Sequence, residues 1–133
     1  MAEQPRDDDR HFHAERSWTR MFTDAVRGVR VAMGEEANFV VHFAVAAAAI
    51  AAGIWVDLSL ERWCLIALCI AIVLAAEMAN TAIEHLARAV TREPNPEVRD
   101  ALDVASAAVL IAALGAAVVA TLLLARPVLE KLA

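Results

Sequence analysis

Three long apolar stretches dominate the second part of the chain, and short polar segments separate them. They cover residues 39–56, 63–86 and 104–125. At about 1.5 Å per residue, each is long enough, or nearly so, to cross about 30 Å of hydrocarbon as a helix. Trp55 and Trp63 flank the first link, as tryptophans do at membrane interfaces. The pattern predicts an all-α membrane protein with three transmembrane helices.

Residues 17–34 show a different pattern, in which apolar and basic side chains occupy different faces of a helix. The apolar positions recur at helical spacing at Trp18, Met21, Phe22, Ala25, Val26 and Val29. Ser17 is a candidate N-cap. This pattern predicts an amphipathic helix that lies in the membrane interface. Residues 1–15 are strongly charged and are expected to form a disordered tail, so that residues 16–133 make one three-span domain.

Composition supports a membrane protein, because 60% of the 133 residues are hydrophobic and the mean hydropathy is +0.53. No basic patch is interleaved with aromatic residues, so a nucleic-acid partner is not expected. Cys64 and Cys69 lie five positions apart within one predicted helix and are expected to be apolar filler. The first apolar stretch begins near Phe39, after a long polar segment, so no cleavable signal peptide is expected.

The distribution of positive charge predicts the orientation of the chain in the membrane. Arginines gather before the first span and in the second link, residues 87–101, at Arg16, Arg20, Arg27, Arg30, Arg88, Arg92 and Arg99. The positive-inside rule therefore places the N-terminus and the second link in the cytoplasm, and the C-terminus on the outer side. Pro94 and Pro96 mark the second link as a turn outside the membrane.

Glu77 interrupts the second apolar stretch and is the strongest candidate for a functional residue. A charged residue at the bilayer centre costs roughly 2.5–3.5 kcal/mol on insertion scales, so it rarely persists without a role. Asn80, Thr81 and Glu84 share its helix face. Counted from Trp63, Glu77 lies about 21 Å along the helix, within the inner leaflet, and Glu84 lies about 31 Å along, at the cytoplasmic interface.

Other polar residues are expected near the same interface, at Glu35, Glu36, Asn38, His42, Asp100 and Asp103. Such a cluster suits Mg²⁺, which prefers oxygen ligands, and a buried carboxylate beside a lipid headgroup suits a general base. Structural alternatives stay open. Asp103 could cap the third span or pair with Arg99, and His42 could be an interhelical hydrogen-bond donor. Glu77 itself could make a buried interhelical hydrogen bond, for instance with Asn80 of a neighbouring helix.

Three motifs resemble the small prokaryotic diacylglycerol kinase and undecaprenol kinase family. The most specific is Glu77-x-x-Asn80-Thr81-Ala82-Ile83-Glu84. The second begins Phe22-x-x-Ala25-x-x-Gly28 and ends Glu36-x-Asn38-Phe39-x-x-His42, and the third is Ala101-x-Asp103-x-Ala105-Ser106.

The resemblance implies a homotrimer in the bacterial cytoplasmic (inner) membrane that transfers the γ-phosphate of ATP to a lipid alcohol, using Mg²⁺. Glu77 would be the general base or its orienter. Asn80 would orient Glu77 or the substrate. Glu36 and Glu84 would hold Mg²⁺ and the ATP phosphates. Asn38 and Asp103 would support the nucleotide site.

The chain departs from the family pattern at Leu102, where a lysine is usual, at Arg88, where an aspartate is usual, and at Val40, where arginine is frequent. Loss of the lysine removes a cation that would face the transferring phosphate. We expect a relocated cation, supplied by Arg99 or by Arg88 across the link, with Arg99 as the favoured substrate-binding replacement.

A lipid kinase acting on undecaprenol or diacylglycerol is the leading hypothesis. A proton-linked transport protein is a second, because such proteins also use carboxylates within the membrane. It requires a polar path on both sides of Glu77, whereas residues 64–76 are apolar. A scaffold that keeps the fold without the chemistry is a third, and Leu102 and Arg88 are the observations that favour it.

Overall fold

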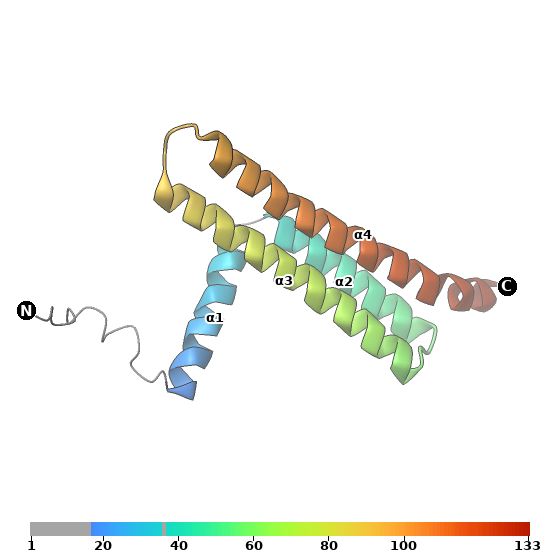
Figure 1. Ribbon diagram of the computed structural model, residues 1–133. Coiled ribbons are helices and arrows are strands. Elements are labelled where there is room, and N and C mark those ends of the chain that lie inside the picture. Colours follow the sequence, from blue (N-terminus) through green and yellow to red (C-terminus); the bar gives the residue numbers. More distant parts are fainter. Residues whose placement is uncertain (1–16, 36) are drawn as a thin grey trace, which may run out of the picture. The chain divides into compact units, whose positions relative to one another are not determined.

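The computed structural model describes residues 17–35 and 37–133, and for residues 35, 37 and 38 it describes the backbone alone. This part of the chain forms α1 (Trp18–Glu35), α2 (Ala37–Trp55), α3 (Leu60–Val90) and α4 (Pro96–Leu132), so the all-α prediction is confirmed. The predicted tail, residues 1–15, lies outside the described residues. The chain divides into two units, residues 1–34 and residues 35–133 (Figure 1).

Helix α1 confirms the helix expected over residues 17–34. It begins where the sequence places its N-cap, since Met21 N–H donates to the carbonyl oxygen of Ser17 at 3.1 Å. Its large apolar side chains are open to the surroundings, with Trp18 85% and Phe22 76% exposed. An exposed apolar stripe on an amphipathic helix is what a membrane interface would cover. That location stays a prediction.

Among the residues that the structure describes, two helices are long and apolar enough to cross a membrane, α3 with 31 residues and α4 with 37. At the helical rise they measure about 46 Å and about 55 Å, so each extends beyond a hydrocarbon layer of about 30 Å. Helix α2 has 19 residues and is strongly apolar, which is near the lower limit for a span. The first predicted span, residues 39–56, therefore has its helix in α2, while its passage through the membrane stays a prediction.

A tight turn connects α2 to α3. The backbone N–H groups of Asp57 and Leu58 donate to the carbonyl oxygens of Ile54 and Gly53, at 3.2 and 3.1 Å. This pair of bonds is a Schellman motif, with Asp57 in the left-handed region at φ 55°. Leu58 then folds back over the helix end, where a Cβ on Gly53 would lie 2.9 Å from Leu58 Cδ1 and from Trp63. Glycine at position 53 thus permits the close return of the chain.

The link between α3 and α4 is shorter than the sequence suggested. Helix continues through Arg88 and starts again at Pro96, so the turn covers residues 91–95 instead of 87–101. The polar residues of this region therefore do not mark the ends of the helices. Asn95 begins α4, because its Oδ1 accepts hydrogen bonds from the N–H groups of Glu97 and Val98, at 2.9 and 3.3 Å.

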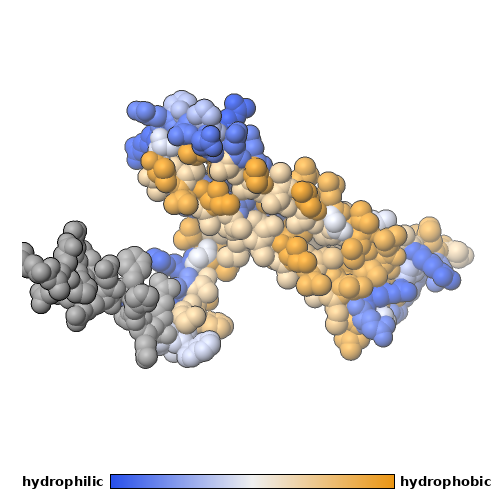
Figure 2. Space-filling model, in the orientation of Figure 1, coloured by the Kyte–Doolittle hydropathy of each residue, from blue (hydrophilic) through white to orange (hydrophobic). Residues whose placement is uncertain are grey.

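Helices α2, α3 and α4 lie side by side, and α3 packs against both of the others (Figure 1). Lys131 Nζ lies 2.8 Å from Asp57 Oδ2, which ties the end of α4 to the α2–α3 turn. The face seen in Figure 2 is apolar along the middle of these helices and hydrophilic at the α3–α4 link. Much of α4 is exposed, including Ile111 at 71% and Leu122 at 75%. Such a surface requires lipid or further protein around it.

Candidate functional site

The polar face predicted on α3 is buried within the unit formed by α2, α3 and α4. Glu77 is 2%, Asn80 5% and Thr81 2% exposed, and they are the only buried polar residues in the part of the chain that the structure describes. They continue the same buried stripe as Ile66 and Val73. The stripe therefore changes from apolar to polar at Glu77, on a helix long enough to span the membrane.

His42 of α2 supplies the partner of Glu77. Its Nε2 lies 2.7 Å from Glu77 Oε1, and the ring N–H donates to the carboxylate in this hydrogen bond. The side chains are 19% and 3% exposed, so the contact is largely shielded from solvent. The two residues are separated by 35 positions in the chain, and only the packing of α2 on α3 brings them together.

This contact confirms the interhelical hydrogen bond that was one alternative for Glu77 and for His42, with His42 as the partner in place of Asn80. It does not exclude a chemical role. A carboxylate held by an imidazole is fixed in orientation, as a general base must be, and its burial makes an unpaired charge costly.

Asn80 connects Glu77's helix to the neighbouring end of α4. Its Nδ2 donates to Glu84 Oε1 at 2.8 Å, one helical turn nearer to the α3–α4 link. On the other side, Ser106 Oγ of α4 donates to Asn80 Oδ1 at 3.5 Å. Asn80 therefore holds Glu84, and the role that the resemblance implies for it, orienting Glu77 or the substrate, stays a prediction. Thr81 completes the face by donating to the carbonyl oxygen of Glu77 at 3.1 Å.

Ser106 is a residue of this cluster that sequence reasoning did not select. It stands in the Ala101–Ser106 motif, but a serine within a membrane helix usually bonds its own backbone. Ser106 Oγ does lie 3.0 Å from the carbonyl oxygen of Leu102. Its second contact, with Asn80, depends on the register between α3 and α4, which no local signal reveals.

Glu84 forms the open end of the polar face. It is half-buried, one turn beyond Asn80, and so it is reachable from the side of the α3–α4 link. Carboxylate and amide oxygens are the ligands that Mg²⁺ prefers, and proteins commonly bind this ion with one or two carboxylates plus substrate phosphates. Glu84 beside Asn80 fits that requirement. The described residues contain no group of three or more acidic, histidine or cysteine ligands.

Arg99 and Asp103 lie on the exposed surface of α4. Their closest charged atoms are 3.9 Å apart, and their side chains are 82% and 72% exposed. The pairing expected between them is present, although an exposed pair of this length contributes little to stability. The structure thus joins Glu77, Asn80 and Glu84 in one polar face, and it places Arg99 and Asp103 on the outside of α4. Glu36 and the side chain of Asn38 lie outside the described residues.

Comparison with known proteins supports the resemblance seen in the motifs. The family model for prokaryotic diacylglycerol kinase matches residues 23–124. The chain is also similar to the undecaprenol kinase of Bacillus subtilis (strain 168), with 34% identity over 104 residues, which cover 78% of this chain and 85% of the relative. The match to the family model includes the polar face of α3, His42 and Ser106.

Proposed function

Because the chain belongs to the prokaryotic diacylglycerol kinase family, and so is a membrane lipid kinase, we propose that it transfers the γ-phosphate of ATP to a membrane lipid alcohol. The observation that carries this proposal is the buried Glu77–His42 pair, at 2.7 Å, one turn from Asn80 and two turns from the half-buried Glu84. Undecaprenol is the first substrate to test, because the similar relative bears that name.

Glu77 acts as the general base in this reaction. Its carboxylate accepts the proton of the lipid hydroxyl as the hydroxyl oxygen attacks the γ-phosphorus, and the bond to the β-phosphate oxygen breaks to release ADP. His42 holds the carboxylate in place. Phosphoryl transfer needs little covalent help from the protein, so position and charge neutralisation supply most of the acceleration.

Glu84 holds the nucleotide end of the site, with Glu36 as the second proposed ligand of Mg²⁺. When bound there, Mg²⁺ would neutralise negative charge on the phosphates during transfer of the γ-phosphoryl group. The hydrogen bond from Asn80 Nδ2 to Glu84 Oε1, at 2.8 Å, holds the Glu84 carboxylate against α3. Asn80 lies between Glu84 and Glu77 along the helix. Asn38 and Asp103 are proposed to support the nucleotide.

Arg99 is proposed to supply the cation that Leu102 lacks. Its side chain is 82% exposed, and its Nε lies 3.9 Å from Asp103 Oδ2, which is a long and weak ion pair. A phosphate can therefore compete with Asp103 for the guanidinium. It stands on the first turn of α4, close to the α3–α4 link that the arginine distribution assigns to the cytoplasm.

The assembly that we propose is a homotrimer in the bacterial cytoplasmic (inner) membrane, with the N-terminus and the α3–α4 link in the cytoplasm. The apolar surface of α4 supports such an assembly, because Leu110, Leu114 and Val118 are more than half exposed in the single chain.

The test is a transfer assay with purified protein in mixed micelles that contain γ-labelled ATP, Mg²⁺ and either undecaprenol or diacylglycerol. We expect labelled undecaprenyl phosphate that depends on Mg²⁺. Label in neither lipid would contradict the proposal. Label in diacylglycerol alone would keep the kinase and show that diacylglycerol, not undecaprenol, is the substrate.

A further inference from the structure

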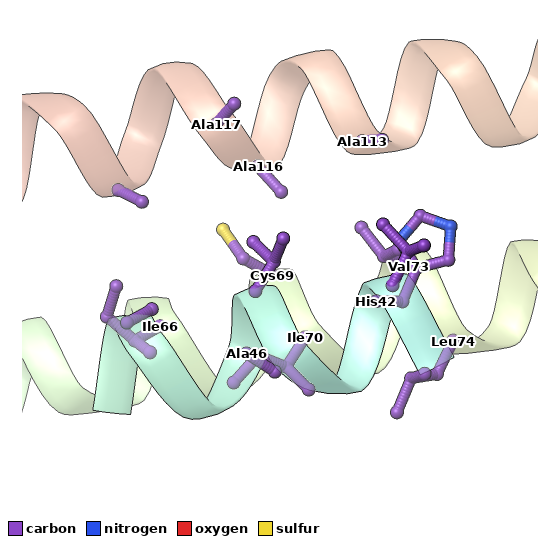
Figure 3. Close-up of a pocket in the computed structure, with 14 residues that line it drawn as sticks. His42, Ala46, Ile66, Cys69, Ile70, Val73, Leu74, Ala113, Ala116 and Ala117 are labelled. Carbon is purple, nitrogen blue, oxygen red and sulfur yellow. The ribbon is translucent and has the colours of Figure 1, made fainter. Parts of the chain in front are cut away.

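His42 has a second ring nitrogen that the contact with Glu77 does not use. Nε2 carries the hydrogen bond to Glu77 Oε1, at 2.7 Å. The ring lines an apolar space between α2, α3 and α4, together with Val73 and Ala113 (Figure 3). In the part of the chain that the structure describes, Nδ1 has no hydrogen-bond partner and is not buried. Because Nε2–H donates to the carboxylate, Nδ1 of the neutral ring keeps its lone pair and can bind a proton.

The other titratable groups on the helices packed around His42 lie at a distance from the pair. Within the described unit, α2 contains no further titratable residue, and α4 contains none from residue 104 to residue 125. On α3, the titratable residues nearest to Glu77 are at least about 10 Å away along the helix. They are Cys69, Glu84 and His85. The charged side chains of Arg99 and Asp103, near the start of α4, are 82% and 72% exposed.

The net charge of the isolated His42–Glu77 pair depends on Nδ1. With a neutral ring, the pair carries the single negative charge of the carboxylate. In the part of the chain that the structure describes, no lysine or arginine forms an ion pair with Glu77. An uncompensated charge among apolar side chains is unfavourable. A proton on Nδ1 makes the ring an imidazolium and the pair neutral, so a proton from solution is the ligand that this pair favours.

That proton determines whether Glu77 can act as a base. When the ring is neutral, the hydroxyl proton that Glu77 accepts removes the negative charge of the pair. When the ring is an imidazolium, the same step leaves the imidazolium as an uncompensated positive charge. The imidazolium also favours the ionised carboxylate, which makes it a weaker proton acceptor. Proton transfer from the lipid hydroxyl is therefore favoured with Nδ1 unprotonated and opposed with Nδ1 protonated.

We propose that His42 is a proton-operated switch on the proposed base: Glu77 accepts the hydroxyl proton only after Nδ1 of His42 has released its own proton. Binding forms one N–H bond at the Nδ1 lone pair, and release returns the proton to water. The inference rests on the proposed kinase function and adds control by pH to the same site. Histidine is suited to this role because its charge ordinarily changes between about pH 5 and pH 8.

The pH dependence of kcat, measured with saturating undecaprenol and MgATP, provides the kinetic test. Below its midpoint, kcat of the unaltered chain should fall by about tenfold per pH unit, as for one proton. His42→Gln keeps an amide N–H for Glu77 but has no nitrogen that titrates. Because the variant loses one of two coupled proton sites, the fall in kcat should move to lower pH by about one unit or more.

His85→Gln is the matched control for that measurement. His85 is a half-buried histidine on α3, two turns beyond Glu77. Its replacement should leave the pH of half-maximal kcat unchanged. A shift in His85→Gln as large as the shift in His42→Gln would assign the pH dependence to a general effect and overturn the proposal.

NMR of the ring nitrogens tests proton binding without catalysis. A variant that keeps His42 as its only histidine, labelled at that residue and studied in detergent micelles, reports its ring alone. The ring should change from neutral to imidazolium over the pH interval in which kcat of the unaltered chain falls. This measurement still decides the question if His42→Gln fails to fold.

An unchanged pH of half-maximal kcat in His42→Gln would overturn the proposal. A His42 ring that keeps one protonation state across the interval in which kcat falls would also overturn it. Either result, obtained with an active enzyme, would leave the proposed function intact. Protonation of His42 in a protein that labels no lipid would support the proton-binding pair and remove the kinase.

Discussion

At the scale of single residues, the sequence identified the centre of the site but not its contacts. Glu77 was predictable because a carboxylate within an apolar stretch is costly and therefore conspicuous. Its partnership with His42 was not, since that contact spans 35 positions and depends on how α2 packs on α3. The contact of the Asn80 amide with Glu84 was also not predicted, and its role toward Glu77 or the substrate stays a prediction.

His42 is expected to act as a positioning residue. His42→Ala removes the hydrogen bond that orients Glu77, and a base displaced by about 1 Å can lose about 100-fold in rate. We expect kcat to fall toward that extent while the KM for ATP stays unchanged. A steady-state assay with both substrates measures the two effects separately.

The conservative variant His42→Gln supplies the control for that prediction, because its amide N–H can donate to the carboxylate. Partial recovery of kcat is expected. If His42→Ala retains full kcat, the orienting role is wrong.

Arg99 is tested by the prediction that it contacts the nucleotide phosphates. Exposed charge pairs contribute up to about 1 kcal/mol, which corresponds to about a fivefold change in binding. Arg99→Ala should therefore raise the KM for MgATP by about fivefold, and the effect should weaken at high salt. Arg126→Ala, at the opposite end of α4, is the matched control. Undiminished ATP turnover in Arg99→Ala would show that Arg99 does not supply the cation that contacts the nucleotide phosphates.

At the scale of elements, apolar length predicted three of the four helices and amphipathic spacing predicted α1, whereas the ends of the helices were predicted less well. The link expected over residues 87–101 covers only 91–95, because α3 and α4 continue as helices beyond the apolar region. Hydropathy reports where a membrane ends. Helix ends depend on local chemistry instead, here on the cap by Asn95 and on the left-handed Asp57.

The α2–α3 turn should be sensitive to the volume of residue 53. Gly53→Ala places a Cβ 2.9 Å from Leu58 and Trp63, and overpacking of this kind costs about 1–3 kcal/mol. Thermal unfolding in detergent should show a lower transition temperature. Gly115→Ala is the control, because no atom lies within 4 Å of its Cβ and alanine favours helix. Equal stability of the two variants would contradict the described turn.

At the scale of the whole molecule, family membership and the helices make the chain an integral-membrane lipid kinase. The described unit adds an arrangement to that identity. A half-buried carboxylate, a buried carboxylate and apolar side chains follow one another along α3, from Glu84 through Glu77 to Ile66. Under the proposed function, this order would let a water-soluble nucleotide and a lipid chain approach the same bond from opposite directions.

This order also bears on the two other functions considered from the sequence. A proton-linked transporter needs polar groups on both sides of Glu77. On the side of α3 away from Glu84, the residues from Val73 back to Ile66 are apolar apart from Cys69. A scaffold without chemistry could keep Glu77 for its hydrogen bond with His42 alone, so label transfer decides between the scaffold and the kinase. The homotrimer and the orientation in the membrane stay predictions.

The central claim is that Glu77 is the base of an ATP-dependent lipid kinase, and label transfer by Glu77→Gln tests it most directly. Gln keeps the size of the side chain and a hydrogen-bond acceptor for His42, but it cannot take up the hydroxyl proton. Transfer from γ-labelled ATP to undecaprenol should fall by about 10²–10⁴-fold relative to the unaltered chain, with the oligomeric state in detergent unchanged. Label transfer at the rate of the unaltered chain would contradict the account.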